Sequence, residues 1–591
     1  MCIKLVERYA GCRCVFYCHA VDACPAYGRR GHLIRSQETL VGFSCSRHTI
    51  GNGGGYIGSS SDPSVRSEDS QAGNAFGGEK DRPKKRNVEA AVDSTLRGRL
   101  LAKVRKVMET DEEFIPTGDL DEVLTLPAIK GELKSYGLED FSSYVFRRAN
   151  KMFAILLVIS KLDALQDLVK EDLGDELLPL AMSAIDLMEE GSKLHAAFSA
   201  WDLESRKQFF EFQWTLLAPV FSDGKHLKLN DDAKLPFIKT EPIANGAYGV
   251  VHRVEIHGDH EKFEKLGSPM SPNGHVYALK EFTRGTANVN QQAFNRELAI
   301  MRSVRSSGHS HIIKLLATFE QRGRYSIILP LAEENLRQFW ARANPTSVVS
   351  HWCLEQMAGI ATALSYLHND LLTQDSRPMR GYHMDLKPEN ILLYEDSSAA
   401  QSVWKISDFG SSYLHPKTSR QELPPHPGLG TYEPPECQLD LPQSQAYDIW
   451  SFGCIFLECA AYLMKGPDSI EAFAKDRLND VEVSGTIFKD DYFFTLEFNE
   501  SFDPLRATIR PAVLKWIREL ERDPSCSEEL SGLLNLIKKG LLQVEQSRRL
   551  KAGDLSQRLD SIRFTGKRLL DSGPQSDSLA TSKAGDVGRG D

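Results

Sequence analysis

Two short polar stretches constrain this chain more than any other part of its sequence. The first is His383-Met-Asp385-Leu-Lys387-Pro-Glu-Asn390, and the apolar run Ile391-Leu-Leu393 follows it directly. The second, Ser407-Asp408-Phe-Gly410, begins seventeen residues after Asn390. An isolated Asp-Phe-Gly carries little information, but the two stretches in this order, with strand-like residues between them, form a specific pattern. The sequence therefore predicts two polar loops separated by a strand.

The two stretches resemble the catalytic loop and the metal-binding loop of the eukaryotic protein kinase superfamily. The resemblance covers roughly residues 236–565 and implies an α+β, bilobal protein kinase fold. It implies that Asp385 is the catalytic base and that Lys387 neutralises charge on the γ-phosphate, while Asn390 and Asp408 hold Mg²⁺. A lysine at the position of Lys387 is typical of the catalytic loop of serine/threonine kinases. The implied reaction therefore transfers phosphate from ATP to Ser or Thr of protein substrates.

A second set of candidate residues lies upstream. Residues 243–251 alternate in polarity around two glycines, and Val276-Tyr-Ala-Leu-Lys280 resembles the strand whose lysine contacts the α- and β-phosphates of ATP. Glu297, in a helix predicted over 291–304, stands where the family places the acid that pairs with this lysine. The resemblance further implies that Leu329 is the gatekeeper and that the hinge follows it. The implied nucleotide-binding residues are Ala244, Gly246, Gly249, Val251, Ala278, Lys280, Glu297, Leu331 and Ala332. Ala244 replaces the usual first glycine, and a positive φ there would cost alanine free energy.

The stretch Gly430-Thr431-Tyr-Glu-Pro-Pro-Glu436 resembles the end of the activation segment of protein kinases. By that resemblance, Thr431 contacts Asp385 and Lys387, and Glu436 pairs with Arg549. Asp448 is expected to hold the backbone of the catalytic loop. These features imply structural support rather than chemistry.

The residue before the catalytic aspartate departs from the family pattern. Met384 stands where an arginine normally pairs with a phosphate on the activation loop. Without that arginine, a phosphate between Ser411 and Thr431 lacks one of its main cationic partners. We predict activity that depends little on phosphorylation of this loop.

The region at 89–222 has apolar residues at helical spacing, most clearly over 141–169 and 204–217. We predict a small all-α domain here. It shows no catalytic constellation of Cys, His or carboxylates, so we expect it to bind a partner protein or to regulate the second domain.

Residues 1–88 are Cys-rich and then Gly- and Ser-rich, a composition that predicts disorder. Six of the eleven cysteines precede residue 46 without the usual paired spacing of a zinc site, so zinc binding and a non-essential segment both remain open. The basic cluster 82–86 is either a nuclear localisation signal or a solvated linker. Residues 566–591 are polar and rich in Ser and Gly, so we predict a disordered tail there.

Charge and hydropathy exclude several classes of protein. The net charge of −10 argues against nucleic acid as the main partner, and the longest apolar run, 153–159, is far shorter than a membrane-spanning helix. No secretory signal pattern is present, so we expect an intracellular protein, cytoplasmic or nuclear.

Two other functions remain open. The kinase fold can serve as a pseudokinase or scaffold that binds nucleotide and partners without phosphotransfer, and Ala244 and Met384 favour this alternative. Phosphorylation of small molecules is the other, disfavoured by the segment at 430–436, which serves protein substrates. The helical region and the hinge sequence also resemble those of kinases from filamentous fungi.

Overall fold

The computed structural model describes residues 2–9, 15–18, 34–41 and most of 94–571. Within the last range the gaps are 108–110, 182–191, 246–248, 265–269, 272–273, 284–286, 306–307, 343–344, 346, 374, 396–401, 418–422, 424–429, 481–489 and 499–503. The chain divides into two compact units, Met1–Ala90 and Ala91–Asp591.

The first unit contains a three-stranded sheet. Its central strand β1 (Cys2–Tyr9) pairs antiparallel with β2 (Val15–Cys18) and parallel with β3 (Ile34–Val41). These strands depart from the disorder expected for residues 1–88, because they are locally rich in the β-branched and aromatic residues that favour strands. The basic cluster 82–86 and the side chains of the early cysteines lie outside the described residues, so those predictions stay open.

The second unit begins with a helical region whose core is helix α5. The side chains at 152–157 are all buried, and a helix that is apolar on every side lies at the centre of its domain. A short two-stranded sheet, β4 (Arg105–Lys106) with β5 (Glu113–Phe114), adjoins the helices. The helices are α1 (Leu96–Leu101), α2 (Thr117–Val123), α3 (Leu126–Lys134), α4 (Ser142–Arg148), α5 (Asn150–Val158), α6 (Leu165–Lys170), α8 (Lys193–Phe198) and α9 (Leu203–Leu216).

The predicted helix at 204–217 is confirmed as α9, whose first turn is capped by Asp202. The predicted helix at 141–169 is instead divided among α4, α5 and α6. The backbone leaves helical geometry at Ala149, where φ is −136°, and again at Ser160, where φ is 59°. Apolar periodicity continues across both breaks, so it could not reveal them.

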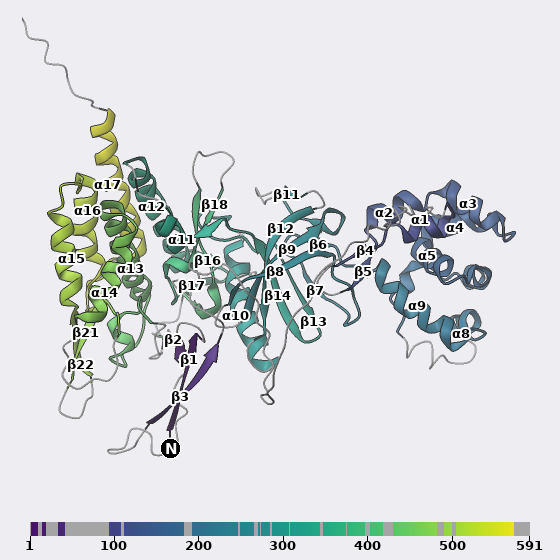
Figure 1. Cartoon of the computed structure of the whole chain (residues 1–591), viewed down its shortest axis with the longest axis horizontal. Coiled ribbons are helices and arrows are strands. Elements are labelled where there is room, and N and C mark those ends of the chain that lie inside the picture. Colours follow the sequence, from purple (N-terminus) through teal and green to yellow (C-terminus); the bar gives the residue numbers. More distant parts are fainter. Residues whose placement is uncertain are drawn as a thin grey trace, which may run out of the picture. The chain divides into compact units, whose positions relative to one another are not determined.

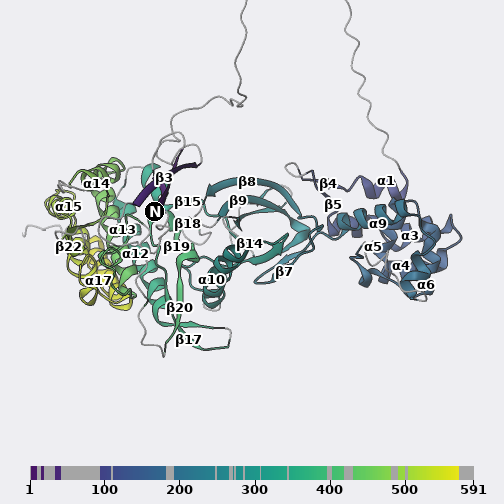
Figure 2. The same ribbon diagram turned by 90° about the horizontal axis from the view of Figure 1, so that it is seen from below.

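A sheet-rich lobe follows the helical region. Its seven-stranded sheet has the order β7-β13-β14-β12-β9-β8, and β11 (Met270–Ser271) pairs with β12. Neighbouring strands are antiparallel except β7 and β13 (Figure 2). The strands are β7 (His226–Lys228), β8 (Phe237–Asn245), β9 (Gly249–His257), β12 (Gly274–Phe282), β13 (Ala317–Gln321) and β14 (Arg324–Pro330).

Helix α10 (Ala287–Arg305) packs against this sheet. Phe294, Leu298 and Met301, which share one face by their spacing, are all buried, as predicted. The Phe294 ring lies 5.7 Å from the ring of Phe282 and 4.9 Å from that of Tyr325, so the helix is fixed to strands β12 and β14 by aromatic contacts.

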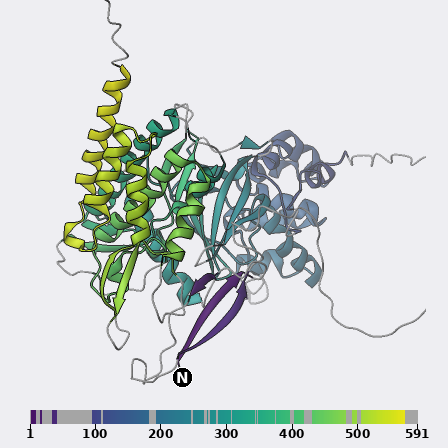
Figure 3. The same cartoon turned by 60° about the vertical axis from the view of Figure 1, so that its left-hand side comes forward.

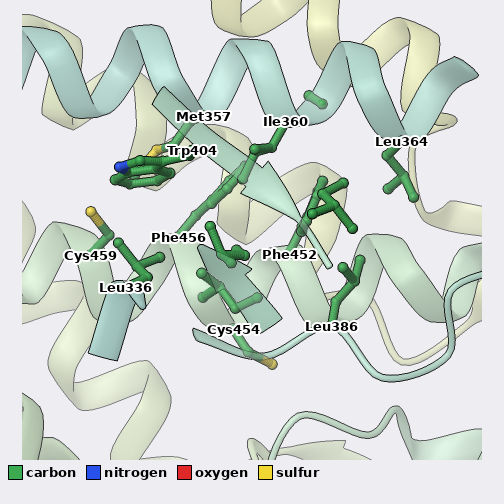
Figure 4. Close-up of a cluster of buried hydrophobic side chains, with 14 of the residues drawn as sticks. Leu336, Met357, Ile360, Leu364, Leu386, Trp404, Phe452, Cys454, Phe456 and Cys459 are labelled. Atoms are coloured by element: carbon green, nitrogen blue, oxygen red, sulfur yellow. The ribbon is translucent and has the colours of Figure 1, made fainter. Parts of the chain in front are cut away.

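The second lobe is mainly helical (Figure 1). Its helices are α11 (Leu336–Arg342), α12 (Ser347–Asn369), α13 (Ala446–Lys465), α14 (Asp468–Asn479), α15 (Pro511–Glu521), α16 (Glu528–Leu536) and α17 (Ala552–Asp571). Helix α13 is buried over 447–463 and forms the centre of the lobe. Met357, Ile360 and Leu364 of α12 point toward Phe452 and Phe456 of α13 (Figure 4). Helix α17 lies along the outer edge, in contact with α12 (Figure 3).

Three small sheets complete this lobe. The strand expected between the two polar stretches is β18 (Ile391–Tyr394), which pairs with β15 (Glu334–Asn335) and β19 (Val403–Ile406). The connection after α12 forms a hairpin, β16 (Leu371–Leu372) and β17 (Pro378–Tyr382), and β17 also pairs with β20 (Tyr413–Pro416). The third sheet is the hairpin β21 (Phe494–Phe498) and β22 (Pro504–Ile509).

Helix α17 continues past the predicted start of the tail at residue 566, and residues 572–591 lie outside the described part. Among the described helices, none combines the length and the apolar character needed to cross a bilayer.

Candidate active site

The amine of Lys280 bonds two carboxylates, one from helix α10 and one from the second polar loop. Its Nζ lies 2.8 Å and 2.7 Å from the two carboxylate oxygens of Glu297 on α10, and 2.8 Å from Oδ1 of Asp408. Lys280 and Glu297 are buried, whereas the Asp408 side chain is 37% exposed. The ion pair predicted between Lys280 and Glu297 is confirmed.

This cluster shifts the protonation of each of its members. Burial alone would lower the pKa of Lys280, but the charges of Asp408 and Glu297 raise it. Burial raises the pKa of Glu297 to about 7, opposed by Lys280. Lys280 holds the pKa of Asp408 well below its usual range, although partial desolvation of Asp408 acts in the opposite direction. Of the two carboxylates bonded to Lys280, Asp408 is therefore the one whose ionised form is favoured.

The catalytic-loop candidates also meet. Lys387 Nζ donates to Asp385 Oδ2 at 2.8 Å, and Asn390 Nδ2 donates to the Asp385 carbonyl at 2.7 Å and to Oδ2 at 3.1 Å. The turn η5 (Pro388–Asn390) brings Asn390 back over Asp385. Burial raises the pKa of Asp385, and the charge of Lys387 offsets part of that rise. A carboxylate with a raised pKa, in contact with an amine, is suited to accept a proton.

Asp448, fully buried at the start of α13, holds the backbone of this loop. Its two oxygens accept from the amides of His383 (2.9 Å) and Met384 (2.8 Å). It also lies 2.9 Å from Nε2 of His368. These bonds confirm the predicted support and fix Met384 at φ 65°, a left-handed geometry that costs a non-glycine residue free energy.

The two polar loops are joined directly to each other by His383, whose Nε2 lies 2.9 Å from the carbonyl of Ser407. His383 was not singled out as a candidate from the sequence. The only hint in the sequence was the place of His383 at the start of the first polar stretch, because the bond joins it to a separate loop.

The phosphate-loop candidates lie on strands β8 and β9. Ala244 faces Val251 in the ladder next to a β-bulge, and its φ is not positive, so the penalty expected for alanine does not arise. A Cβ on Gly249 would lie 1.7 Å from the carbonyl oxygen of Glu281, so only glycine fits there. Gly246 lies outside the described residues.

The hinge candidates follow β14. Ala278 pairs with Leu329, and β14 ends at Pro330, so Leu331 and Ala332 connect the two lobes. The buried Tyr394 hydroxyl donates to the carbonyl of Pro330 at 3.1 Å. Tyr394 was not among the sequence candidates, since it lies on β18, far along the chain.

The proposed metal ligands suit Mg²⁺. Asp408 supplies carboxylate oxygens, and Asn390 directs its Nδ2 toward Asp385, which leaves the amide oxygen as its ligating atom. Magnesium prefers oxygen ligands and in nucleotide sites takes one or two carboxylates beside the phosphates. Among the described residues there is no group of three or more His, Cys, Asp or Glu that could hold a metal by itself.

The contact predicted for Thr431 is wrong. Its hydroxyl donates to Asp491 Oδ1 at 2.7 Å, and the described hydrogen bonds do not join it to Asp385 or Lys387. Asp491 belongs to the segment before β21, whose backbone is held by Arg477. Sixty residues separate the partners, so no local pattern signalled this bond.

Met384, which replaces the arginine usual in the family, packs against apolar side chains. Met384, Tyr382, Leu423 and Tyr447 form a separate buried cluster, which we call the Met384 cluster. Leu423 belongs to the activation segment, and its backbone exchanges hydrogen bonds of 3.1 and 3.0 Å with Gln443. The segment is thus anchored beside the catalytic loop by hydrophobic contact, where an arginine would have required an anion.

Comparison with known proteins agrees with this geometry. Residues 269–558 match the protein kinase domain family. Cyclin-dependent kinase 4 of Ovis aries is 26% identical over 227 residues, which cover 37% of this chain and 66% of that protein. The cyclin-dependent kinase 4 homolog of Caenorhabditis elegans is 28% identical over 39% of this chain and 52% of its own length. Homeodomain-interacting protein kinase 4 of Mus musculus is 29% identical over 27% of this chain and 25% of its own length.

Residues 269–558 of the chain therefore belong to the eukaryotic protein kinase superfamily. Residues 269–558 are its protein kinase domain, and the predicted α+β fold with a helical region ahead of it is confirmed. The chain spans less than two thirds of the length of the curated relatives named above. The family match begins between β9 and β12, so the strands of the phosphate loop and everything before them lie ahead of it.

Proposed function

We propose that this protein is a serine/threonine protein kinase that transfers the γ-phosphate of ATP to protein substrates. The observation that carries the proposal is the position of Lys280, bonded to Glu297 and Asp408 at once. This contact connects the strand that would carry the nucleotide phosphates with the loop that would hold the metal. The family match and the serine/threonine kinases among its relatives support it.

In this proposal, Lys280 orients the α- and β-phosphates, and Glu297 keeps its amine in place. The backbone around Gly249 covers the phosphates, and the hinge at Leu331 and Ala332 receives the adenine, with Ala278 and Val251 above it. Magnesium, when bound by Asn390 and Asp408, neutralises phosphate charge. Catalysis of this kind rests on positioning and on fixed charges rather than on a covalent intermediate.

Asp385 accepts the proton of the substrate hydroxyl. It is within hydrogen-bond reach of Lys387, whose charge faces the transferred phosphate. The proton passes from the Ser or Thr oxygen to the Asp385 carboxylate as the oxygen attacks the γ-phosphorus and the bond to the β-phosphate oxygen breaks. Complete acid, base and metal positions favour this activity over a pseudokinase or scaffold.

The proposal is tested by phosphotransfer from labelled ATP with magnesium to a basic protein such as histone, followed by identification of the phosphorylated amino acid. Label on Ser or Thr supports it, and Asp385→Asn should lower kcat by about 10²–10⁴-fold while nucleotide binding persists. Binding of ATP without transfer would favour the scaffold alternative. Binding of a partner protein through residues 89–222, an intracellular location and the absence of nucleic-acid binding remain proposals alongside it.

A further inference from the structure

The linker between α9 and β8 runs along the sheet-rich lobe and contributes two short strands to it. Residues 221–222 form strand β6 and pair in parallel with β10 (Glu261–Lys262). Strand β7 then pairs in parallel with β13 and forms the edge of the seven-stranded sheet, with His226 opposite Thr318. We call residues 221–229 the strap. It lies ahead of the residues that match the protein kinase family.

The strap is anchored by apolar side chains. Phe221 is fully buried, and its ring lies 6.0 Å from that of Phe237 and 5.5 Å from that of Phe319. Leu227 and Leu229 pack against the same cluster. Burying apolar side chains of this size stabilises the contact between strap and sheet, so the strap is a fixed part of the lobe.

Between these anchors, the strap touches helix α10. Asp223 Oδ2 lies 3.8 Å from the guanidinium of Arg305, the last residue of α10, and 3.0 Å from Nζ of Lys314. The ring of His226 lies 6.0 Å from that of Phe294, although His226 itself is largely exposed. The strap therefore meets α10 on both sides of Glu297, which lies three residues beyond Phe294.

Gly224 makes the closest approach. Its backbone has φ 69°, and a Cβ built on it would lie 1.4 Å from Nη1 of Arg305. A left-handed turn that brings backbone against a side chain requires glycine. Its amide also donates to the carbonyl of Leu316 just before β13. The turn thus ties the end of α10 to the edge of the sheet.

We propose that Asp223 and Gly224 are positioning residues, which hold Arg305 and with it helix α10 so that Glu297 stays bonded to Lys280. The strap would then make the linker before the kinase domain part of the catalytic machinery. The kinetic side of this inference rests on the proposed function. Its structural side does not, because the placement of α10 can be measured without phosphotransfer.

The test is a double-mutant cycle in the full chain with Asp223→Ala, Arg305→Ala and both together. Asp223→Glu serves as the conservative rescue. The matched control is Asp231→Ala, outside the strap. It removes the hydrogen bond that the Arg322 amide donates to Asp231 Oδ1, and Asp231 has no described contact with α10. Amide hydrogen exchange over residues 287–305 and the KM for ATP are the two readouts.

We expect Asp223→Ala and Arg305→Ala each to accelerate exchange in α10 and to raise the KM for ATP about two- to fivefold, the range for a partly exposed ion pair. The double variant should match either single variant, Asp223→Glu should restore the wild-type values, and Asp231→Ala should change neither readout. Additive effects, or equal effects of Asp231→Ala, would overturn the inference. If the wild type transfers no phosphate, the proposed function fails, and exchange in α10 alone decides whether the strap positions the helix.

Discussion

Glu436 and Arg549 form a two-pronged ion pair in which each carboxylate oxygen lies 2.7 Å from one guanidinium nitrogen. Both side chains are almost completely buried, although 113 residues separate them in the sequence. The pair was predicted from the family resemblance and is confirmed. It ties the end of the activation segment to the segment before α17, so it should control the stability of the helical lobe.

Glu436→Gln leaves the charge of Arg549 buried without its partner. We expect the free energy of unfolding to fall by about 3–5 kcal/mol, as for other broken buried pairs. Arg549→Lys should be nearly as damaging, because an ammonium cannot reproduce the planar fork. Urea unfolding measures both. The neighbouring Arg548, which pairs with Glu545 on the surface, supplies the control: Arg548→Lys should stay within about 0.5 kcal/mol of the wild type. A small effect at Glu436 would contradict the structural role.

Asp448→Asn replaces one carboxylate oxygen by an NH₂ group, which cannot accept a hydrogen bond. The backbone amides of His383 and Met384 each donate to one of the two carboxylate oxygens, so one of these bonds is lost. We expect the free energy of unfolding to fall by about 3 kcal/mol, because a charged acceptor is lost and a buried donor is left unpaired. Thermal unfolding checks this. Asp440→Asn is the control, since Asp440 is exposed and asparagine tolerates its positive φ. Equal melting temperatures for the two variants would refute the support role of Asp448.

The pH dependence of phosphotransfer should report Asp385. As the proposed base, Asp385 must be ionised, so kcat/KM should fall as the pH drops through its pKa, which burial raises above the ordinary carboxyl value. Lys387 lowers that pKa. In Lys387→Met the acid limb should therefore move to higher pH, on top of any loss in rate. Lys417→Met, which changes an exposed lysine without a described contact to Asp385, should leave the limb in place. A limb that stays fixed or moves to lower pH in Lys387→Met would exclude Asp385 as the titrating group.

Phosphorylation of the activation segment should matter little for activity. The Met384 cluster anchors Leu423 without an arginine, so a phosphate would meet fewer cations there. Phosphatase-treated and phosphorylated preparations should differ by no more than about threefold in kcat, whereas a gain of about a hundredfold on phosphorylation would contradict the prediction.

The packing of Leu423 in the Met384 cluster leads to a further prediction. Leu423→Ala removes buried apolar contacts, so we expect it to lower kcat in both preparations. The exposed Leu441→Ala serves as the control and should retain activity. Wild-type activity in Leu423→Ala would show that the cluster does not hold the activation segment.

The sequence by itself determined the features that depend on neighbouring residues. Asp385, Lys387 and Asn390 lie within one turn of backbone, so their spacing fixed their approach to one another. Helices α9 and α10 followed from apolar periodicity, which reports the buried face of a helix wherever it packs.

Only the tertiary structure decided which distant residues meet where the family resemblance implied no contact. The bond of Thr431 to Asp491, the packing of Leu423 on Met384 and the pairing of β7 with β13 join segments that carry no mutual signal in the sequence. The breaks at Ala149 and Ser160 and the strands within residues 1–88 escaped prediction for a related reason. Local patterns record what a residue prefers, whereas its partner is set by how whole elements pack and by which polar groups burial forces together.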